Sequence, residues 1–117
     1  MALKNFVERF TKPVEELDRQ QLSAYCDSLA FTPMDRIEPR RPVRVGGEVR
    51  ALRIVPRAGA PALEVTVSDG RGAVVAVFLG RRKIAGLTPG RRIVIEGVTA
   101  RDGNRFVVFN PVYELLA

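Results

Sequence analysis

The sequence predicts an all-β fold in which a five-stranded barrel follows one or two N-terminal α-helices. After residue 42 the sequence contains five short runs rich in apolar residues; residues 63–67 alternate apolar and polar, the period of a strand with one face in a core, and residues 73–79 are apolar on both faces. Glycine, proline and an Asp-Gly pair separate these runs, as they do in turns. Before residue 38 the apolar residues instead recur every three or four positions, the spacing of a helix. We therefore expect a helical segment with a linker over residues 1–38 and the barrel over residues 39–117.

Two apolar stripes predict the N-terminal helices. Their members are, in the first helix, Leu3, Phe6, Val7 and Phe10 and, in the second, Leu22, Tyr25, Cys26 and Leu29. Pro13 marks the start of the second helix, because proline suits the first helical turn. We expect these helices to plug the barrel or to pack on its side, and a dimer contact is the alternative. Three prolines between residues 32 and 42 predict a linker.

The first predicted strand is long and bent. It covers residues 43–55, with Gly46 and Gly47 inside it. Glycine within a strand commonly marks a bulge or a tight bend, and such a bend lets one strand serve two sides of a small barrel. Residues 56–61, which begin and end with proline, predict a loop to the second strand.

Four shorter strands complete the predicted barrel. The expected strands are the second at 63–67, the third at 73–79, the fourth at 93–98 and the fifth at 106–109. A turn at 69–72, a connection at 80–90 with a helical turn near 83–85, and a hairpin at 101–104 join them in that order. The longest connection therefore lies between the third and fourth strands. This arrangement predicts a Greek-key barrel of the OB type, with an SH3-like barrel as the alternative.

Composition excludes several kinds of chemistry. The 117-residue chain has no histidine and a single cysteine, Cys26, so that a Ser-His-Asp triad, a Cys-His pair, a histidine-ligated metal site and an internal disulfide are all excluded. The carboxylates do not group on the predicted strands, and no glycine-rich stretch carries the Lys-Ser/Thr of a phosphate loop. We expect no enzyme activity, cofactor, metal or small-molecule substrate. We also expect no membrane span and no signal peptide, and the cytoplasm is the simplest compartment.

Positive charge is concentrated in the predicted barrel. Residues 1–38 contain five basic and seven acidic side chains, whereas residues 39–117 contain fourteen basic and six acidic ones. Nearly all of these basic residues are arginine, which presents a planar fork of donors to phosphate and stacks on bases. The barrel is therefore predicted to bind nucleic acid. A solvated surface in a chain from a GC-rich genome is the alternative.

Several short motifs resemble those of a known group of domains. They are V-x-V-x-G-x-V at 43–49, D-G-x-G at 69–72, L-x-P-G at 87–90, Glu96-Gly97 and Asn110-Pro111. On these motifs the segment resembles the OB-fold nucleic-acid-binding domains, a group that includes the wedge domain of the RecG branched-DNA helicase and the anticodon-binding OB domains. The whole chain also looks like small stand-alone actinobacterial OB-fold proteins with a helical N-terminus. The motifs are mainly structural glycines and core positions, so the resemblance indicates the fold more than the ligand.

The resemblance implies nucleic-acid binding without a cofactor. OB domains of this kind bind their ligand on a platform formed by the second and third strands. The loop between the first and second strands and the loop between the fourth and fifth strands form the walls of the site. Here those loops carry Arg53 and Arg57 on one side and Arg101 and Arg105 on the other. By topology, these arginines are implied to contact the ligand.

The third strand departs from the helicase wedge at its end. There, two aromatic residues end the strand and the outward one can stack on a base; here the pair is Phe78-Leu79. Alternation along the strand predicts that its outward side chains are Val75, Val77 and Leu79. Phe109 on the last strand is the substitute for the missing aromatic, unless it packs under the N-terminal helices.

Two basic runs flank the connection between the third and fourth strands. They are Arg81-Arg82-Lys83 and Arg91-Arg92. With Arg40, Arg41 and Arg44 they are predicted to form a track for phosphates, and a solvated loop is the alternative. Because adjacent strand residues point to opposite faces, only Arg92 of the second run is assigned to the ligand. The predicted nucleic-acid-binding residues are Arg44, Arg53, Arg57, Val75, Val77, Leu79, Arg81, Arg82, Lys83, Arg92, Arg101, Arg105 and Phe109.

The predicted function is non-catalytic binding of single-stranded DNA or RNA in a basic groove of the barrel. The alternative is a module for a protein partner or a second copy, which uses the outward apolar strip of the third strand and the N-terminal helices. Whether that strip is covered separates the two functions. A role in DNA repair or recombination follows only from fold-level analogy with the helicase wedge.

Overall fold

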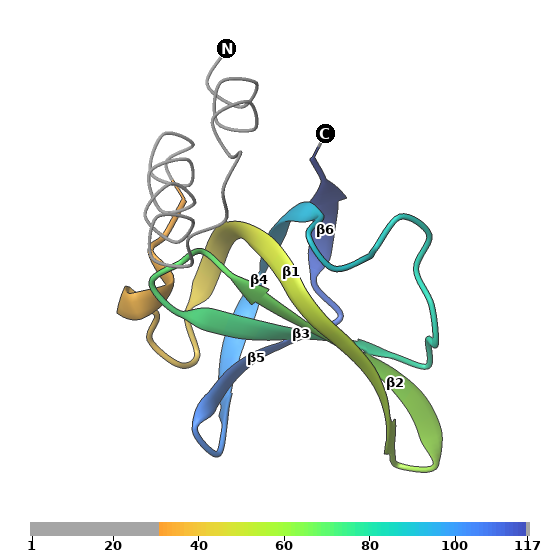
Figure 1. Ribbon diagram of the computed structural model, residues 1–117. Helices are drawn as coiled ribbons and strands as arrows, with labels where there is room; N and C mark the ends of the chain where they lie inside the picture. The colour runs from red at the N-terminus through yellow and green to blue at the C-terminus, as the bar shows by residue number, and fades with distance from the viewer. Residues whose placement is uncertain (1–30, 117) are drawn as a thin grey trace.

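The computed structural model describes residues 31–116, and the predicted N-terminal helices lie outside these residues. The described part of the chain is almost entirely β-structure (Figure 1). A short 3-10 helix, η1 (Met34–Arg36), precedes the strands. The six strands are β1 Pro42–Arg57, β2 Ala60–Ser68, β3 Ala73–Leu79, β4 Arg92–Asp102, β5 Arg105–Phe109 and β6 Val112–Leu115.

The first five strands close into a barrel. Their order is β1-β2-β3-β5-β4, and β1 also pairs with β4, which closes the sheet. Neighbouring strands are antiparallel except β3 and β5, which are parallel. The mostly-β, barrel-like fold predicted from the sequence is therefore confirmed. β6, which follows Pro111 and pairs with β4, was not predicted.

β1 serves two sides of the barrel, as predicted. Its first half pairs with β4 and its second half with β2. The bulge, however, lies between Val49 and Ala51 and not at the two glycines. A Cβ on Gly47 would lie 2.4 Å from the backbone oxygen of Ser68. Glycine is thus required at this position for the close approach of β2.

The β1–β2 connection is a tight hairpin, so the predicted loop at residues 56–61 is wrong. Pro56 pairs with Pro61, and the chain turns only at Ala58 and Gly59. Both turn residues have a positive φ, 51° and 80°, as the two-residue type I′ turn requires. Two facing prolines are compatible with the ladder, because every second pair of opposite residues in an antiparallel ladder exchanges no backbone hydrogen bonds and so needs no N–H donor.

The β4–β5 hairpin also extends further than predicted. β4 continues to Asp102, which pairs with Arg105, whereas the predicted strand ended at residue 98. Gly103 has a φ of 63° at the first turn position, where a two-residue hairpin favours glycine. The β1–β2 and β4–β5 hairpins flank β3 on its two sides (Figure 1).

Inward-facing side chains of the strands fill the barrel, and one end is covered by η1. Met34 and Ile37, from the segment predicted as a linker, belong to the same core cluster as the barrel valines and isoleucines. Asp69 fastens this segment: its Oδ2 accepts a hydrogen bond from the Met34 N–H at 2.8 Å. Its Oδ1 accepts from the backbone N–H groups of Arg71 and Gly72, within the predicted turn.

The β3–β4 connection covers the opposite end of the barrel. Its Ile84 and Leu87 are buried in the core cluster. Residues 80–91 contain turns and no helix, so the helical turn predicted near residues 83–85 is wrong. Gly86 has a φ of 80°, which turns the chain away from a right-handed helix directly after this segment.

Candidate nucleic-acid interface

The outer face of β3 is apolar but covered. Val75 and Val77 point away from the barrel core, as alternation predicted, yet both are buried. They form a second apolar cluster with Ala62 and Val107. The prediction that Val75 and Val77 contact bases is therefore wrong, because other side chains lie over them. Leu79, at the end of the strand, is exposed as predicted.

Charged side chains from neighbouring strands converge over this face. The Glu64 side chain on β2 is only 2% exposed. Its Oε1 accepts hydrogen bonds from Arg53 and Arg105, and its Oε2 accepts one from Arg57, each at 3.1 Å. Since β3 lies between β2 and β5 in the sheet, the Arg105–Glu64 pair crosses the outer face of β3.

Asp102 links the two hairpins. Its Oδ2 accepts hydrogen bonds from Arg105 at 3.0 Å and from Arg57 at 3.5 Å. Arg57 belongs to the β1–β2 hairpin and Asp102 to the β4–β5 hairpin, so the ion pair joins the two walls that flank β3. We refer to the five residues as the hairpin cluster: Arg53, Arg57, Glu64, Asp102 and Arg105.

The arginines keep both carboxylates of the hairpin cluster ionised. Burial by itself raises the pKa of Glu64, but the hydrogen bonds from Arg57, Arg105 and Arg53 outweigh burial and hold that pKa below its ordinary value. The hydrogen bond from Arg105 likewise lowers the pKa of Asp102. The hydrogen bond to Asp102 and, to a smaller extent, the hydrogen bond to Glu64 raise the pKa of Arg105. The cluster therefore carries three positive and two negative charges at neutral pH.

Sequence reasoning assigned the three arginines of the hairpin cluster to this face but missed its carboxylates. Glu64 lies in the predicted second strand, 63–67, and Asp102 in the predicted hairpin at 101–104, and neither was assigned to the ligand. A two-residue type I′ turn fixes the register of its hairpin, and this register places Arg53 opposite Glu64. Recognition of the turn in the sequence would therefore have predicted this pair. The Arg105–Asp102 pair also lies across a hairpin, but the Arg105–Glu64 contact depends on the parallel β3–β5 pairing, which has no local signal.

An exposed apolar pair borders the hairpin cluster. Phe109 is 43% exposed, and Leu79 is exposed to the same degree. The Asn110 Oδ1 accepts a hydrogen bond from the Leu79 N–H at 2.9 Å, which joins the ends of β3 and β5. The Arg57 guanidinium lies 5.4 Å from the centroid of the Phe109 ring. One arginine thus contacts both the charged cluster and the exposed aromatic ring.

The basic run at residues 81–83 lies beside the β1–β2 hairpin. The Gly80 N–H donates to the Pro61 carbonyl oxygen at 2.8 Å, which fixes the start of the run against that hairpin. Arg81, Arg82 and Lys83 are all exposed, and within residues 31–116 none of them makes an ion pair. Cations therefore stand on both sides of one hairpin.

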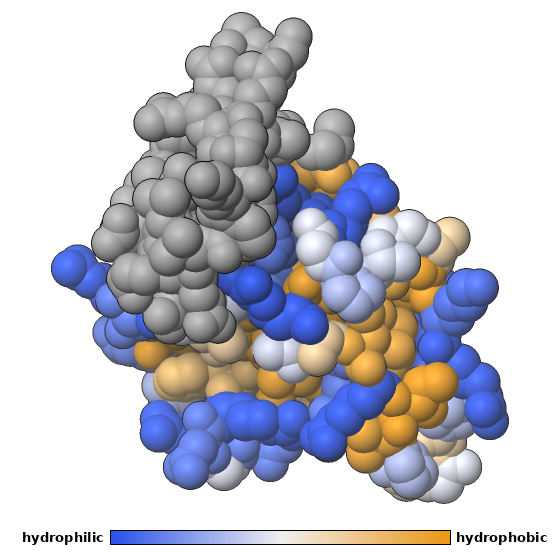
Figure 2. Space-filling model, viewed as in Figure 1, coloured by the Kyte–Doolittle hydropathy of each residue, from blue (hydrophilic) through white to orange (hydrophobic). Residues whose placement is uncertain are grey.

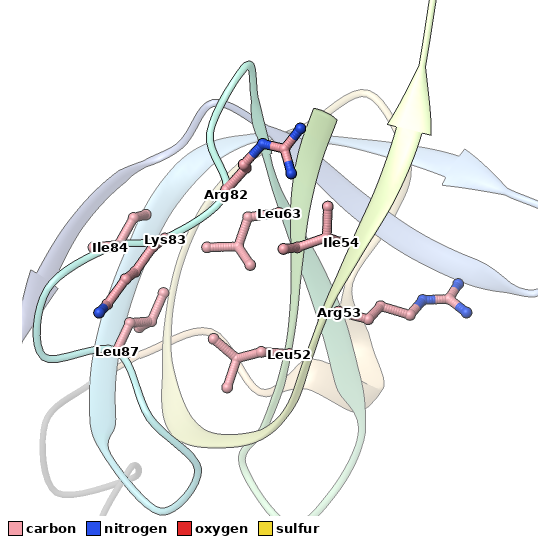
Figure 3. Close-up of a pocket in the computed structure, with 8 residues that line it drawn as sticks. All are labelled: Leu52, Arg53, Ile54, Leu63, Arg82, Lys83, Ile84 and Leu87. Atoms are coloured by element: carbon pink, nitrogen blue, oxygen red, sulfur yellow. The ribbon is translucent and has the colours of Figure 1, made fainter. Parts of the chain in front are cut away.

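A groove of about 370 Å³ separates the β3–β4 connection from β1 (Figure 3). Its floor is aliphatic and consists of Leu52, Ile54, Leu63, Ile84 and Leu87. Arg82 stands over these side chains, whereas Arg53 points away from them (Figure 3). At the lower right of Figure 2, where the β1–β2 hairpin lies, hydrophobic surface is visible between hydrophilic side chains. Within the described part of the chain no aromatic residue lines the groove.

Three other predicted residues lie apart from the hairpin cluster. Arg44 is in the half of β1 that pairs with β4, and its Nε lies 3.1 Å from a carboxylate oxygen of Glu96. Arg92 is half-buried at the start of β4. Arg101 is exposed on the β4–β5 hairpin, with its guanidinium 5.3 Å from the ring centroid of Phe106.

Two arginines of the predicted basic track make contacts within the protein. Arg41 lies 3.8 Å from a carboxylate oxygen of Glu38. The Arg91 side chain donates a hydrogen bond to the Leu116 carbonyl oxygen at 3.0 Å. The continuous track stays a prediction, and the structure places a concentration of cations around the β1–β2 hairpin.

Comparison with known proteins finds similarity at the level of the fold. No family model matches the sequence, and no curated protein matches it. A structure of RecG bound to a three-way DNA junction is similar over 77% of this chain, with a TM-score of 0.51 and 16% identity. The barrel shares its fold with part of RecG. The chain spans 14% of the length of that protein, and at this identity the likeness shows the fold alone.

The resemblance to RecG predicted from the motifs is therefore confirmed at the level of the fold. The more specific resemblances, to its wedge domain, to anticodon-binding domains and to small actinobacterial proteins, stay predictions. Over residues 31–116 no helix has the length and apolar character needed to cross a membrane. In the same residues no three His, Cys, Asp or Glu side chains lie together in a group suited to a metal ion.

Proposed function

We propose that this protein binds single-stranded DNA or RNA on the outer face of an OB-type barrel and does no chemistry on it. The observation that carries the proposal is the concentration of cations around the β1–β2 hairpin, next to the exposed ring of Phe109. Arg53 and Arg57 stand on one side of this hairpin, and Arg82 and Lys83 on the other. A nucleic-acid backbone and its bases need this combination of cations and an exposed ring.

The barrel architecture supports this location. OB folds bind nucleic acid on the face of their second and third strands, between the β1–β2 and β4–β5 connections. Here these connections are the two hairpins that flank β3, and the long connection 80–91 between β3 and β4 favours the OB type over an SH3-like barrel. RecG, which shares the fold, has been solved with a DNA junction, and this supports nucleic acid as the partner.

Electrostatic contacts supply most of the proposed affinity. Each phosphate that an arginine or lysine neutralises releases condensed counterions, so the affinity falls as the salt concentration rises. Stacking of a base on an aromatic ring adds about 1–3 kcal/mol, and Phe109 is the exposed aromatic on this face. Binding is therefore expected to be strongly dependent on salt and tolerant of sequence. The cytoplasm remains the proposed compartment, and a role in DNA repair remains an analogy with RecG.

The groove supports a second candidate function, the binding of a protein partner. The apolar strip first considered for this role is buried at Val75 and Val77. The groove instead exposes aliphatic side chains, and Ile54 is exposed over half of its surface. Because no aromatic residue of the described part of the chain lines the groove, its floor suits a peptide better than a nucleotide.

Fluorescence anisotropy with labelled oligothymidylate, unstructured RNA and duplex DNA at several salt concentrations tests the proposed function. Both single strands are expected to bind more tightly than the duplex. A triple variant with glutamine at Arg81, Arg82 and Lys83 is expected to flatten the slope of log K against log salt by about 2, at about 0.7 per phosphate contact. The matched control places glutamine at three arginines near η1, at the other end of the barrel: Arg36, Arg40 and Arg41.

The control triple variant should leave the slope unchanged. Equal slopes for both triple variants would mean that overall charge alone attracts the strand, without the proposed interface. Absence of binding even at low salt would refute nucleic-acid binding and leave the groove and a protein partner as the remaining candidate.

A further inference from the structure

The two carboxylates of the hairpin cluster differ in their access to solvent. Glu64 is 2% exposed and lies beneath its arginines, whereas the side chain of Asp102 is 48% exposed at the end of β4. Both present anionic oxygens to guanidinium groups, and a nucleic-acid phosphate presents oxygens of the same kind. Asp102 can therefore leave its arginines for solvent, and Glu64 cannot.

We propose that the hairpin cluster is the subsite for one nucleotide, in which a backbone phosphate replaces Asp102 between Arg57 and Arg105 and the base stacks on Phe109. The inference rests on the proposed function and names the subsite at which it operates. Asp102 lies 3.0 Å from Arg105 and 3.5 Å from Arg57, so its carboxylate marks a position that both guanidiniums reach. A phosphodiester carries one negative charge, as Asp102 does, and the exchange preserves the charge balance of the cluster.

Glu64 is the positioning residue of this subsite. Its hydrogen bonds to Arg53, Arg57 and Arg105 hold three long side chains from two strands in one arrangement. A guanidinium has five N–H donors, and the contacts with the two carboxylates use only part of them. The arginines are thus fixed in place while keeping donors for a phosphate.

Arg57 joins the phosphate position to the base position. Its guanidinium contacts Asp102 on one side and lies 5.4 Å from the ring centroid of Phe109 on the other. A base on the exposed ring would therefore lie next to its own phosphate, and guanidinium groups themselves stack on bases. The subsite reads the phosphate and the flat face of a base and makes no contact that requires a particular base.

The test compares two variants that make the same change of charge. Asp102→Asn removes the competitor of the phosphate, whereas Glu96→Gln frees Arg44 on a different part of the barrel. We expect Asp102→Asn to tighten oligothymidylate binding by about two- to fivefold, the range for one exposed ion pair, and to steepen the salt slope by about 0.7. Glu96→Gln should do neither. Phe109→Leu should weaken binding about fivefold or more.

A second measurement separates the subsite from the proposed function. Inorganic pyrophosphate is titrated into the full chain while the arginine Nε–H resonances are followed by NMR. The resonances of Arg57 and Arg105 should shift and that of Arg44 should not. If pyrophosphate shifts them but neither oligothymidylate nor unstructured RNA binds, the proposed function fails and the anion subsite stands. If oligothymidylate binds but the resonances stay fixed and Asp102→Asn behaves like Glu96→Gln, the subsite is overturned and the function stands. If neither ligand binds, both are overturned.

Discussion

Substitution of Glu64 tests whether the hairpin cluster stabilises the fold. The buried carboxylate accepts hydrogen bonds from three arginines, each at 3.1 Å. Glu64→Gln keeps the volume and one acceptor oxygen but removes the charge. The guanidiniums of Arg53, Arg57 and Arg105 then converge without the counter-charge at their centre. We expect the free energy of unfolding to fall.

The magnitude follows from the burial of the partners. Breaking a buried ion pair costs about 3–5 kcal/mol, and a hydrogen bond to a charged group contributes about 1.5–3 kcal/mol. The arginine side chains here are 29–66% exposed, so water compensates part of the loss. We therefore expect a loss of about 2–3 kcal/mol, which lowers Tm by roughly 8–15 °C for a domain of this size.

Urea unfolding followed by far-UV circular dichroism measures this loss, and its pH dependence tests the cause. The folded-state pKa of Glu64 lies below the ordinary value of 4.5, so the ionised carboxylate stabilises the fold above the unfolded-state pKa. That contribution is lost as the pH falls through the folded-state pKa. The gap between wild type and Glu64→Gln should therefore be full at neutral pH and shrink in acid.

Glu96→Gln, at an exposed ion pair, is the control and should change stability by less than about 1 kcal/mol. Two results would refute the reasoning. One is a Glu64→Gln gap at neutral pH below about 0.5 kcal/mol, the size expected of an ordinary surface substitution. The other is a gap that stays the same when the pH falls to about 3, below the ordinary glutamate pKa.

Three substitutions test the fold itself by thermal unfolding. Ala58→Asn should raise stability by about 0.5–1 kcal/mol, because asparagine tolerates the positive φ of a type I′ turn; a loss would contradict the turn assignment. Asp69→Ala should cost about 2–4 kcal/mol, because the buried N–H of Met34 loses its acceptor, whereas an unchanged Tm would mean that η1 is not fastened there. Gly47→Ala should cost about 2–3 kcal/mol, because the added Cβ meets the backbone oxygen of Ser68; full stability would show that β2 can move away.

The sequence predicted those parts of the fold that are set by local patterns. The third strand was placed at its observed bounds, Ala73–Leu79, because it is a short apolar run between two turn signals. The far ends of β1 and β4 were missed, because residues such as Pro56 and Arg101 carry no apolar alternation. These residues are held in strands by pairing with their hairpin partners, which a local pattern does not encode.

The site was harder to predict, because its chemistry depends on contacts between strands. The resemblance to OB domains assigned Arg57 and Arg105, by topology, to the two connections beside the predicted platform, and the structure brings both side chains into one ion-paired cluster. No acidic partner was predicted for either arginine, because the predicted strands and turns do not show which carboxylates lie beside them. Burial of Val75 and Val77 was missed for the same reason: alternation gives the direction of a side chain and says nothing about what lies over it.

The two acidic residues of the hairpin cluster are expected to act in opposite ways, and this difference can be measured in one pair of variants. Glu64 is buried, so its loss should appear mainly as lower stability. Asp102 is half exposed, so its loss should leave stability nearly unchanged and appear as tighter binding. If both carboxylates served only to join the hairpins, Asp102→Asn would loosen the walls beside β3 and weaken binding. The sign of the change in affinity therefore decides whether Asp102 holds the interface together or occupies the place of its ligand.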